Sequence, residues 1–172
     1  MQFTFIDDYT LLGGELTMEQ HNIQTHNHSY EYVNKQCCCF NMRKIMRAVT
    51  QYYDRYLEPS GIRSTQFTLL VALASTSAKT LTEIAENLVM DRTTLTRNLK
   101  PLAKMGLITI VHTMDKRSKA YALTDKGKEL VITCIPLWES AQNSVINGVG
   151  SENYHEIMVR LEKLLNTLSL HK

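Results

Sequence analysis

The segment from Asp91 to Gly127 carries side chains suited to binding a polyanion. Nine basic and two acidic residues lie between Arg92 and Lys128, a surplus of +7 in a chain whose net charge is +2. Charge concentrated in this way indicates a polyanionic partner, because the charge of a whole protein mainly tunes its solubility. A solvated lysine-rich surface would explain the same surplus, so the arrangement of these residues decides between the two.

Residues 92–104 have the spacing of a helix with two unlike faces. Leu95, Leu99 and Leu102 fall within about 60° of one another at about 100° per residue. Arginine can bond guanine edges, and threonine can reach phosphates or thymine methyl groups. We therefore expect this helix to read the major groove of DNA, with an ordinary basic surface helix as the alternative. The residues expected on or beside its exposed face are Arg92, Thr93, Thr94, Thr96, Arg97, Lys100 and Lys104.

A β-hairpin is expected directly after this helix, because two short strand-like runs flank the sequence TMDKRSKA. Its tip places Arg117 and Lys119 where no core needs them, and an arginine there can enter an adjacent minor groove. Asp115 is expected to orient one of the arginines of the preceding helix. The strand-like runs contain Ile108, Ile110, Tyr121 and Leu123.

Local signals predict how this helix begins and ends. Thr80 with Glu83 is a capping-box pattern for a short helix that precedes it. Asp91 is a good N-cap for the basic helix, and Gly106 stands where a C-terminal glycine belongs. Pro101 is expected to kink the helix, because its ring cannot accommodate the usual backbone hydrogen bond. Two short helices followed by a hairpin describe a winged helix-turn-helix.

Apolar stripes predict the remaining helices. One runs from Cys37 to the sequence EPSG, and a second, apolar on nearly all sides, follows Ser64 and should lie centrally in the core. Thr124 is expected to be the N-cap of a long helix, which should bend at Pro136, and a last amphipathic helix follows the sequence GVGSEN. Residues 1–35 lack such a period and are expected to form a poorly structured tail. The fold class is therefore mainly α with a small β wing.

The chain resembles the MarR family of winged helix-turn-helix transcriptional regulators over about residues 37–170. The resemblance rests on the sequences LTEIAENLVMDRTTLTRNLKPLAKMGLI, YALTDKGKEL and PLWESAQ, and on the Asp-x-Arg pattern at Asp115–Arg117. One position departs from the family pattern. Val89 stands where relatives usually carry glycine in the turn between the two short helices, which predicts some backbone strain.

The resemblance implies a homodimer that binds double-stranded DNA. Residues 36–62 and 124–170 would form a helical dimerisation region, and residues 63–123 would form the winged helix-turn-helix domain. Each protomer would offer one winged helix to half of a pseudo-palindromic operator. Repression is the family's usual mode, so a repressor released by an effector or by thiol oxidation is expected.

The sequence QCCCFNM resembles the sensing helix of the branch of this family that responds to organic hydroperoxide. Cys39 and Phe40 match its cysteine–phenylalanine pair, with Cys37 and Cys38 as neighbouring candidates. Tyr53 falls where that branch has a tyrosine bonding the thiolate, and Ser64 takes the place of a second such tyrosine. A thiol in the first turn of a helix has its thiolate favoured by the helix dipole. The alternative is that these cysteines are small buried or incidental surface residues.

A small aromatic effector is the other signal expected. It would bind in a pocket among the first, second and fifth helices. The residues expected to line such a pocket are Phe40, Tyr53, Phe67 and Trp138.

Other classes of function lack their signatures. No apolar run approaches the eighteen or so residues of a membrane span, and acids stand where a secretory signal would carry bases. A cytoplasmic protein with reduced thiols is therefore expected. Neither the adjacent cysteines nor the loose group of His21, His26 and His28 predicts a metal site, and no cofactor is expected.

No catalytic motif is present, and His112 beside Asp115 is ordinary surface chemistry, so an enzyme is not expected. A winged-helix protein-interaction module without operator binding stays open as the alternative. Such a module would not need a cationic recognition face with threonines.

Overall fold

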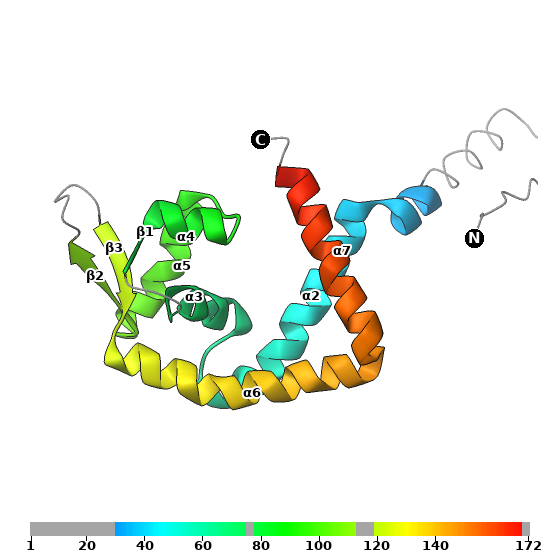
Figure 1. Cartoon of the computed structure of the whole chain (residues 1–172). Coiled ribbons are helices and arrows are strands. Elements are labelled where there is room, and N and C mark those ends of the chain that lie inside the picture. Colours follow the sequence, from blue (N-terminus) through cyan, green and yellow to red (C-terminus); the bar gives the residue numbers. More distant parts are fainter. Residues whose placement is uncertain (1–29, 75–77, 113–118, 170–172) are drawn as a thin grey trace, which may run out of the picture. The chain divides into compact units, whose positions relative to one another are not determined.

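The computed structural model describes residues 30–74, 78–112 and 119–169, except for the side chain of His112. The chain divides into two compact units, Met1–Met46 and Arg47–Lys172. Helix α2 (Cys38–Leu57) begins in the first unit and ends in the second. The buried core and the sheet both belong to the second unit (Figure 1).

Helical structure in the first unit begins earlier than the sequence predicts, because residues 30–36 are already helical. The last carbonyls of such a short helix have no partners within it. The Asn41 side-chain amide donates to the carbonyls of Asn34 and Lys35 at 3.3 Å and to that of Cys37 at 3.0 Å. A cap supplied from the next helix leaves no periodic signal in the sequence. The remainder of the predicted tail, including its histidines, lies outside the described residues.

The central apolar helix is confirmed as α3 (Ser64–Ala74), which follows the short 3-10 helix η1 (Glu58–Ser60). It buries Phe67, Leu69, Leu70 and Leu73, whereas Val71 is 42% exposed. The Asp54 carboxylate accepts hydrogen bonds from the Ser64 backbone N–H and hydroxyl, both at 2.7 Å. This acceptor from α2 satisfies donors at the start of α3.

The two short helices are α4 (Leu81–Asn87) and α5 (Arg92–Lys104), and their predicted caps are confirmed. Thr80 and Glu83 form a capping box, and these hydrogen bonds from Thr80 hold the pKa of the Glu83 carboxyl below its usual value. Helix α5 continues through Pro101 to Lys104. Gly106 then adopts a φ of 71° and donates to the Ala103 carbonyl, so it ends the helix as predicted.

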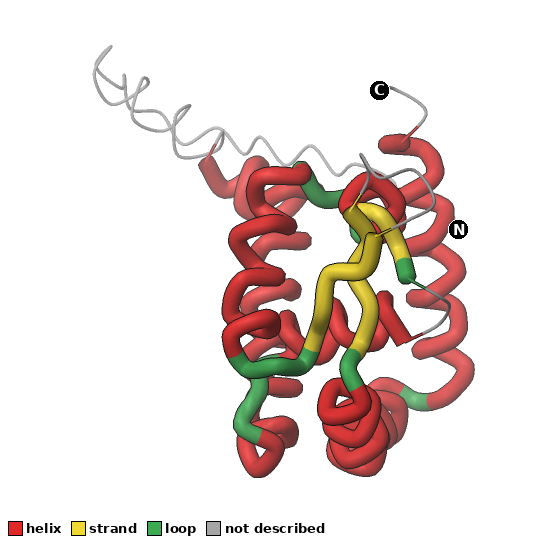
Figure 2. The backbone as a smooth tube through the Cα atoms, turned by 90° about the vertical axis from the view of Figure 1, so that its left-hand side faces the viewer, coloured by secondary structure: helices red, strands yellow, loops and turns green. Residues whose placement is uncertain are grey.

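The predicted hairpin consists of β2 (Ile108–His112) and β3 (Lys119–Leu123). They pair antiparallel, with Ile108 opposite Leu123 and His112 opposite Lys119. A third strand, β1 (Lys79–Thr80), pairs with the other edge of β3 and gives the order β1-β3-β2, which Figure 2 shows as a narrow sheet. Two residues are too few to show an alternating pattern, so β1 was not predicted.

Helices α6 (Asp125–Val149) and α7 (Ser151–Ser169) complete the second unit and contact each other near the turn that joins them. Figure 1 shows α6 as one unbroken, curved helix that contains Pro136. Gly150, with a φ of 90°, separates it from α7. Helix α6 buries four residues, including Cys134, whereas α7 buries none. The apolar stripe predicted on the last helix is therefore present but not buried in this chain.

Candidate nucleic-acid interface

Helix α5 is fixed to the domain by its leucines. Leu95 and Leu102 are fully buried and Leu99 is 2% exposed, and all three belong to the core cluster of the second unit. At the start of the helix the Asp91 carboxylate accepts a hydrogen bond from the Thr94 backbone N–H at 2.8 Å. Hydrogen bonding to Thr94 lowers the pKa of Asp91 from its usual value, which favours the charged form that caps the helix. The predicted inward face is confirmed.

The opposite side of α5 carries the cations. Arg97 and Lys100 are exposed, and they line, together with Arg92, Thr93 and Thr96, an open hollow of ≈ 370 Å³. Lys104 is exposed one turn further on, and Thr94 is half-buried. Among the described residues none of these four basic side chains forms an ion pair. The basic face is therefore not neutralised by acidic partners within the part of the chain that is described.

The threonines of this face are not equivalent. The Thr96 hydroxyl donates to the Arg92 carbonyl at 2.7 Å, so its proton is used within the helix although the side chain is exposed. Thr93 is exposed in the first turn of α5 and lines the hollow beside Arg92 and Arg97. Side chains from the first turns of a helix are those that reach base edges in helix-turn-helix proteins.

The wing contributes Lys119, which is exposed at the start of β3. Asp115 and Arg117, predicted to form the tip, lie outside the described residues. Their expected roles stay predictions.

The turn before α5 contains the strain that the sequence predicts. Val89 has a φ of 52° and is the one described residue other than glycine with a positive φ. A β-branched side chain rarely adopts this left-handed conformation. Its N–H donates to the Glu86 carbonyl at 3.2 Å, and the Met90 N–H donates to Ala85 at 2.8 Å, which keeps the turn closed.

The predicted redox residues occupy the start of α2. Cys38 and Cys39 are exposed in its first turn, and Cys37 is half-buried just before it. The Cys37 sulfur accepts a hydrogen bond from the Phe40 backbone N–H at 3.4 Å. Arg43 lies one helical turn after Cys39, and hydrogen bonding to the Cys39 side chain raises the pKa of Arg43.

Tyr53 lies where α2 contacts α6, and its expected bond to a thiolate stays a prediction. Its hydroxyl donates to the Gln142 side-chain oxygen of α6 at 2.6 Å, and Gln142 donates in turn to the Tyr154 hydroxyl of α7 at 2.7 Å. Burial, together with the neighbouring tyrosines, raises the pKa of Tyr53. The hydroxyl proton of Tyr53 is therefore used in a hydrogen bond between α2 and α6.

The predicted effector-pocket residues are found in different surroundings. Phe67 is 7% exposed within the core, Trp138 is 36% exposed on α6, and Phe40 is 46% exposed on α2. The pocket stays a prediction.

In the described residues, no group of three or more histidine, cysteine or carboxylate side chains could hold a metal ion. In the same part of the chain, no helix is long and apolar enough to cross a membrane.

Sequence reasoning missed the contacts that join α5 to α6. The Thr124 hydroxyl donates to the Gly106 carbonyl at 2.7 Å, and the Lys126 ammonium donates to the Met105 carbonyl at 2.9 Å. Thr124 was predicted only as an N-cap and Lys126 was counted only as charge. No local pattern indicates that they reach the end of the preceding helix.

Comparison with known proteins identifies the winged helix. Residues 62–140 match the family described as "ArnR1-like, winged-helix domain". The structure of the Mycobacterium tuberculosis transcriptional regulator MosR in complex with DNA is 33% identical, with a TM-score of 0.68, and the match covers 77% of this chain and 98% of MosR.

Two curated relatives agree with this result. The HTH-type transcriptional regulator SarZ of Staphylococcus epidermidis is 28% identical over 78% of this chain and 83% of its own length. The organic hydroperoxide resistance transcriptional regulator of Bacillus subtilis is 32% identical over 52% of this chain and 61% of its own length. These relatives are transcriptional regulators rather than enzymes. This chain belongs to the MarR family of DNA-binding, winged-helix transcriptional regulators.

Proposed function

We propose that this chain is a cytoplasmic, homodimeric repressor that binds a pseudo-palindromic operator with α5 in the major groove. The observation that carries the proposal is the face of α5, where exposed cations and threonines lie opposite fully buried leucines. Arg97 is the residue expected to bond a guanine edge, and Lys100 and Lys104 are expected to contact phosphates. Arg117 and Lys119 of the wing would lie along the adjacent minor groove.

The dimer is proposed from helix α7. Its apolar side chains are exposed in this chain, although they repeat at helical spacing as a buried face would. A second copy of the chain would cover them, as the resemblance implies. The side chains concerned are Ile157, Met158, Leu161, Leu165 and Leu168, each at least 38% exposed.

The test of operator binding is selection of bound DNA from a random pool, followed by titration of the selected sequence. Arg97→Ala should weaken operator binding about tenfold to a hundredfold, because a good arginine–guanine pair contributes roughly 1–3 kcal/mol. Lys100→Ala should weaken binding to all sequences alike and reduce the salt dependence by about one phosphate contact.

Lys163→Ala, which removes an exposed charge from α7, is the matched control. Its affinity should equal that of the wild type. If no DNA sequence is selected and the chain binds only a protein partner, the result would instead favour an interaction module that does not bind an operator.

Release of DNA by thiol oxidation is the second part of the proposal. It is supported by the exposed Cys39 with Arg43 one turn away, and by the similarity to a regulator named for organic hydroperoxide resistance. The Cys39 thiolate would attack the peroxide O–O bond and form a sulfenic acid, while the leaving alkoxide takes up a proton to become an alcohol. A small aromatic effector is the alternative signal.

Cumene hydroperoxide added to reduced protein should release the operator, and Cys39→Ser should prevent the release. Cys38→Ser is the matched control, because Cys38 is also exposed in the first turn of α2. Release that persists in Cys39→Ser would eliminate Cys39 as the sensor.

A further inference from the structure

The first turn of α6 is built onto the end of α5. The Thr124 hydroxyl donates to the Gly106 carbonyl at 2.7 Å and accepts from the Gly127 backbone N–H at 3.1 Å. The Thr124 backbone N–H donates to the Leu107 carbonyl at 3.1 Å. One residue therefore caps α6 and, through two separate hydrogen bonds, fixes the chain that follows α5.

Lys126 adds a charged contact at the same place. Its ammonium donates at 2.9 Å to the carbonyl of Met105, the C-cap residue of α5. The last carbonyls of a helix lack intrahelical partners and carry the negative end of its dipole. A lysine there satisfies one of them and is favoured by the dipole.

Gly127 shows how closely α6 approaches the chain that follows α5. A Cβ atom at this position would lie 2.1 Å from the Leu107 carbonyl oxygen, which is a backbone atom and cannot move aside. Gly127 is buried, and the Leu107 carbonyl already accepts the Thr124 N–H. The contact between α6 and the residues that follow α5 is therefore too tight to admit a single methyl group.

These contacts have a consequence beyond capping. Helix α5 carries the recognition face, and α6 leads to α7, whose exposed apolar face is the proposed dimer surface (Figure 1). The orientation of α5 relative to α6 then determines where each recognition helix lies in the dimer. Half-site spacing on DNA follows from the same geometry.

We propose that Thr124 and Lys126 are positioning residues that set the operator spacing without touching DNA. The proposal rests on the proposed function as a homodimeric operator-binding protein. Thr124 acts through its hydroxyl proton, which holds the Gly106 carbonyl, and Lys126 acts through the Met105 carbonyl. Loss of either contact lets the recognition helix change its orientation relative to α6. The affinities for operators with different half-site spacings then become more similar.

The decisive variant is Thr124→Asp. An aspartate still caps α6 by accepting from the Gly127 N–H, but it has no proton to donate to the Gly106 carbonyl. Thr124→Ser keeps both functions and is the conservative rescue. The comparison therefore separates the joint to α5 from the capping of α6.

Binding is measured on the selected operator and on copies with one base pair inserted or removed between the half-sites. For Thr124→Asp we expect about tenfold weaker binding to the selected operator, because one hydrogen bond contributes up to about that factor. The preference of the wild type for the correct spacing should shrink by a similar factor. Thr124→Ser should match the wild type in both measurements.

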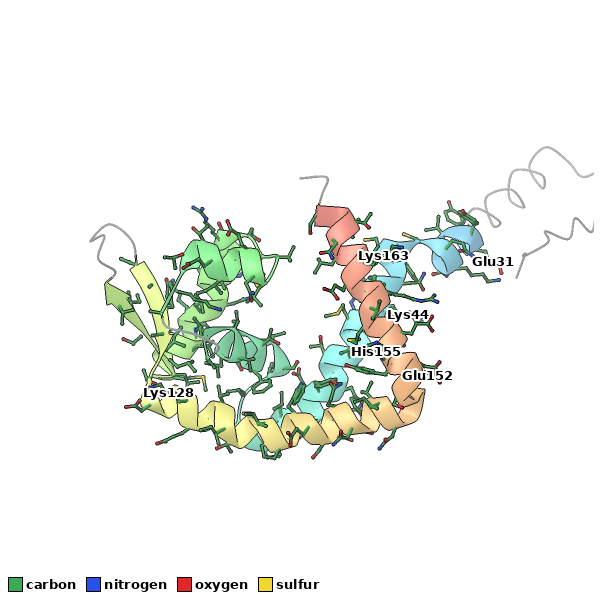
Figure 3. All side chains as sticks on the ribbon, in the orientation of Figure 1. Glu31, Lys44, Lys128, Glu152, His155 and Lys163 are labelled. Carbon is green, nitrogen blue, oxygen red and sulfur yellow. The ribbon has the colours of Figure 1, made fainter. Side chains whose placement is uncertain are left out.

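Lys126→Met tests the second contact against a direct phosphate contact. A positioning role predicts weaker binding with an unchanged slope of log K against log salt, whereas a lost phosphate contact lowers that slope by about 0.9. The control is Lys128→Met, since Lys128, labelled in Figure 3, stands on the same turn of α6. Among the described residues it pairs only with Asp125. It should change neither the affinity nor the spacing preference.

Thermal unfolding shows whether a variant has simply failed to fold. If Thr124→Asp keeps the wild-type unfolding temperature, affinity and spacing preference, the positioning role is overturned. It is also overturned if affinity falls only in step with that temperature. A wild type that binds a single half-site as tightly as the full operator would overturn the proposed dimeric function and the inference with it, whereas an unaltered spacing preference in both variants overturns the inference alone.

Discussion

Helices α5 and α7 carry the same leucine spacing but use it differently. Leu95, Leu99 and Leu102 repeat at i, i+4 and i+7 and are at most 2% exposed. The corresponding positions in α7, which are Leu161, Leu165 and Leu168, are 38%, 47% and 61% exposed. The leucine spacing predicts a buried face, but it does not indicate whether the same chain or a partner chain buries it.

The largest effect is expected from introducing charged side chains into the exposed apolar face of α7. The double variant Leu161→Glu/Leu165→Glu should be monomeric, because burying two carboxylates at an apolar interface is strongly unfavourable. Operator binding should weaken by about a hundredfold or more, since two linked half-site contacts become one. Helix content should stay near the wild type, as neither leucine is buried in the chain. Light scattering and operator titration measure the two effects.

The matched control for this variant is Lys163→Glu (Figure 3). Residue 163 is two positions from Leu161, so its side chain projects from a different side of α7, about 200° away at about 100° per residue. A dimer is expected in this control. If the double variant also remains dimeric, α7 is not the dimer surface, and its exposed leucines need another explanation.

The next effect distinguishes leucines that are buried within the chain from leucines that are buried against a partner chain. Leu95→Ala should lower the free energy of unfolding by about 2–5 kcal/mol, because it leaves a cavity under a fully buried side chain. Leu165→Ala should lower it less. Its loss should be smallest at low protein concentration and should grow as the concentration is raised into the range where the wild type dimerises, since the substitution weakens association. Urea unfolding at several protein concentrations measures both. Equal and concentration-independent losses would contradict the distinction between the two helices.

The features that could be predicted from the sequence are local ones. Asp91, Thr80 and Gly106 act within a few residues of their own position, so their caps can be recognised from residue type and spacing. The leucines of α5 could be assigned to the core because their period matches the helix. Most of the fold and the basic face of the site follow from such signals.

The remaining features depend on residues that are far apart in the sequence. Tyr53 bonds Gln142, 89 residues away, and Thr124 bonds Gly106, 18 residues away. No pattern of spacing could indicate these pairs, because either partner alone is an ordinary polar residue at a helix surface or cap. The two-residue strand β1 was missed for a related reason, since only its pairing with β3 defines it.

A smaller effect, of opposite sign, is expected in the turn that leads into α5. Val89→Gly should stabilise the protein by about 1 kcal/mol. The substitution relieves roughly 1–2 kcal/mol of strain in the left-handed backbone conformation. Part of this gain is lost because glycine has greater conformational freedom in the unfolded chain. Little packing is lost, because Val89 is 52% exposed. The measurement is the urea midpoint, and Val89→Ala is the control. Because alanine keeps the Cβ atom, an equal gain in that variant would show that β-branching, rather than backbone conformation, is the source of the strain.

The smallest effect concerns the cap that starts α5, and it is visible only as a pH dependence. Hydrogen bonding to Thr94 lowers the pKa of Asp91 in the folded protein. The unfolded chain therefore takes up a proton first as the pH falls, so the stabilisation from Asp91 is complete above its unfolded pKa of about 3.9 and is lost as the pH falls through the folded value. Asp91→Asn keeps a capping side chain that does not titrate.

The free energy of unfolding of Asp91→Asn should consequently fall less steeply than that of the wild type between about pH 5 and pH 3. Glu83 is present in both proteins, and its own lowered pKa leaves a shared slope that cancels in the comparison. Parallel pH profiles would mean that the Asp91 carboxylate does not stabilise the start of α5. The position of the recognition helix would then depend on its leucines and on the joint at its C-terminal end.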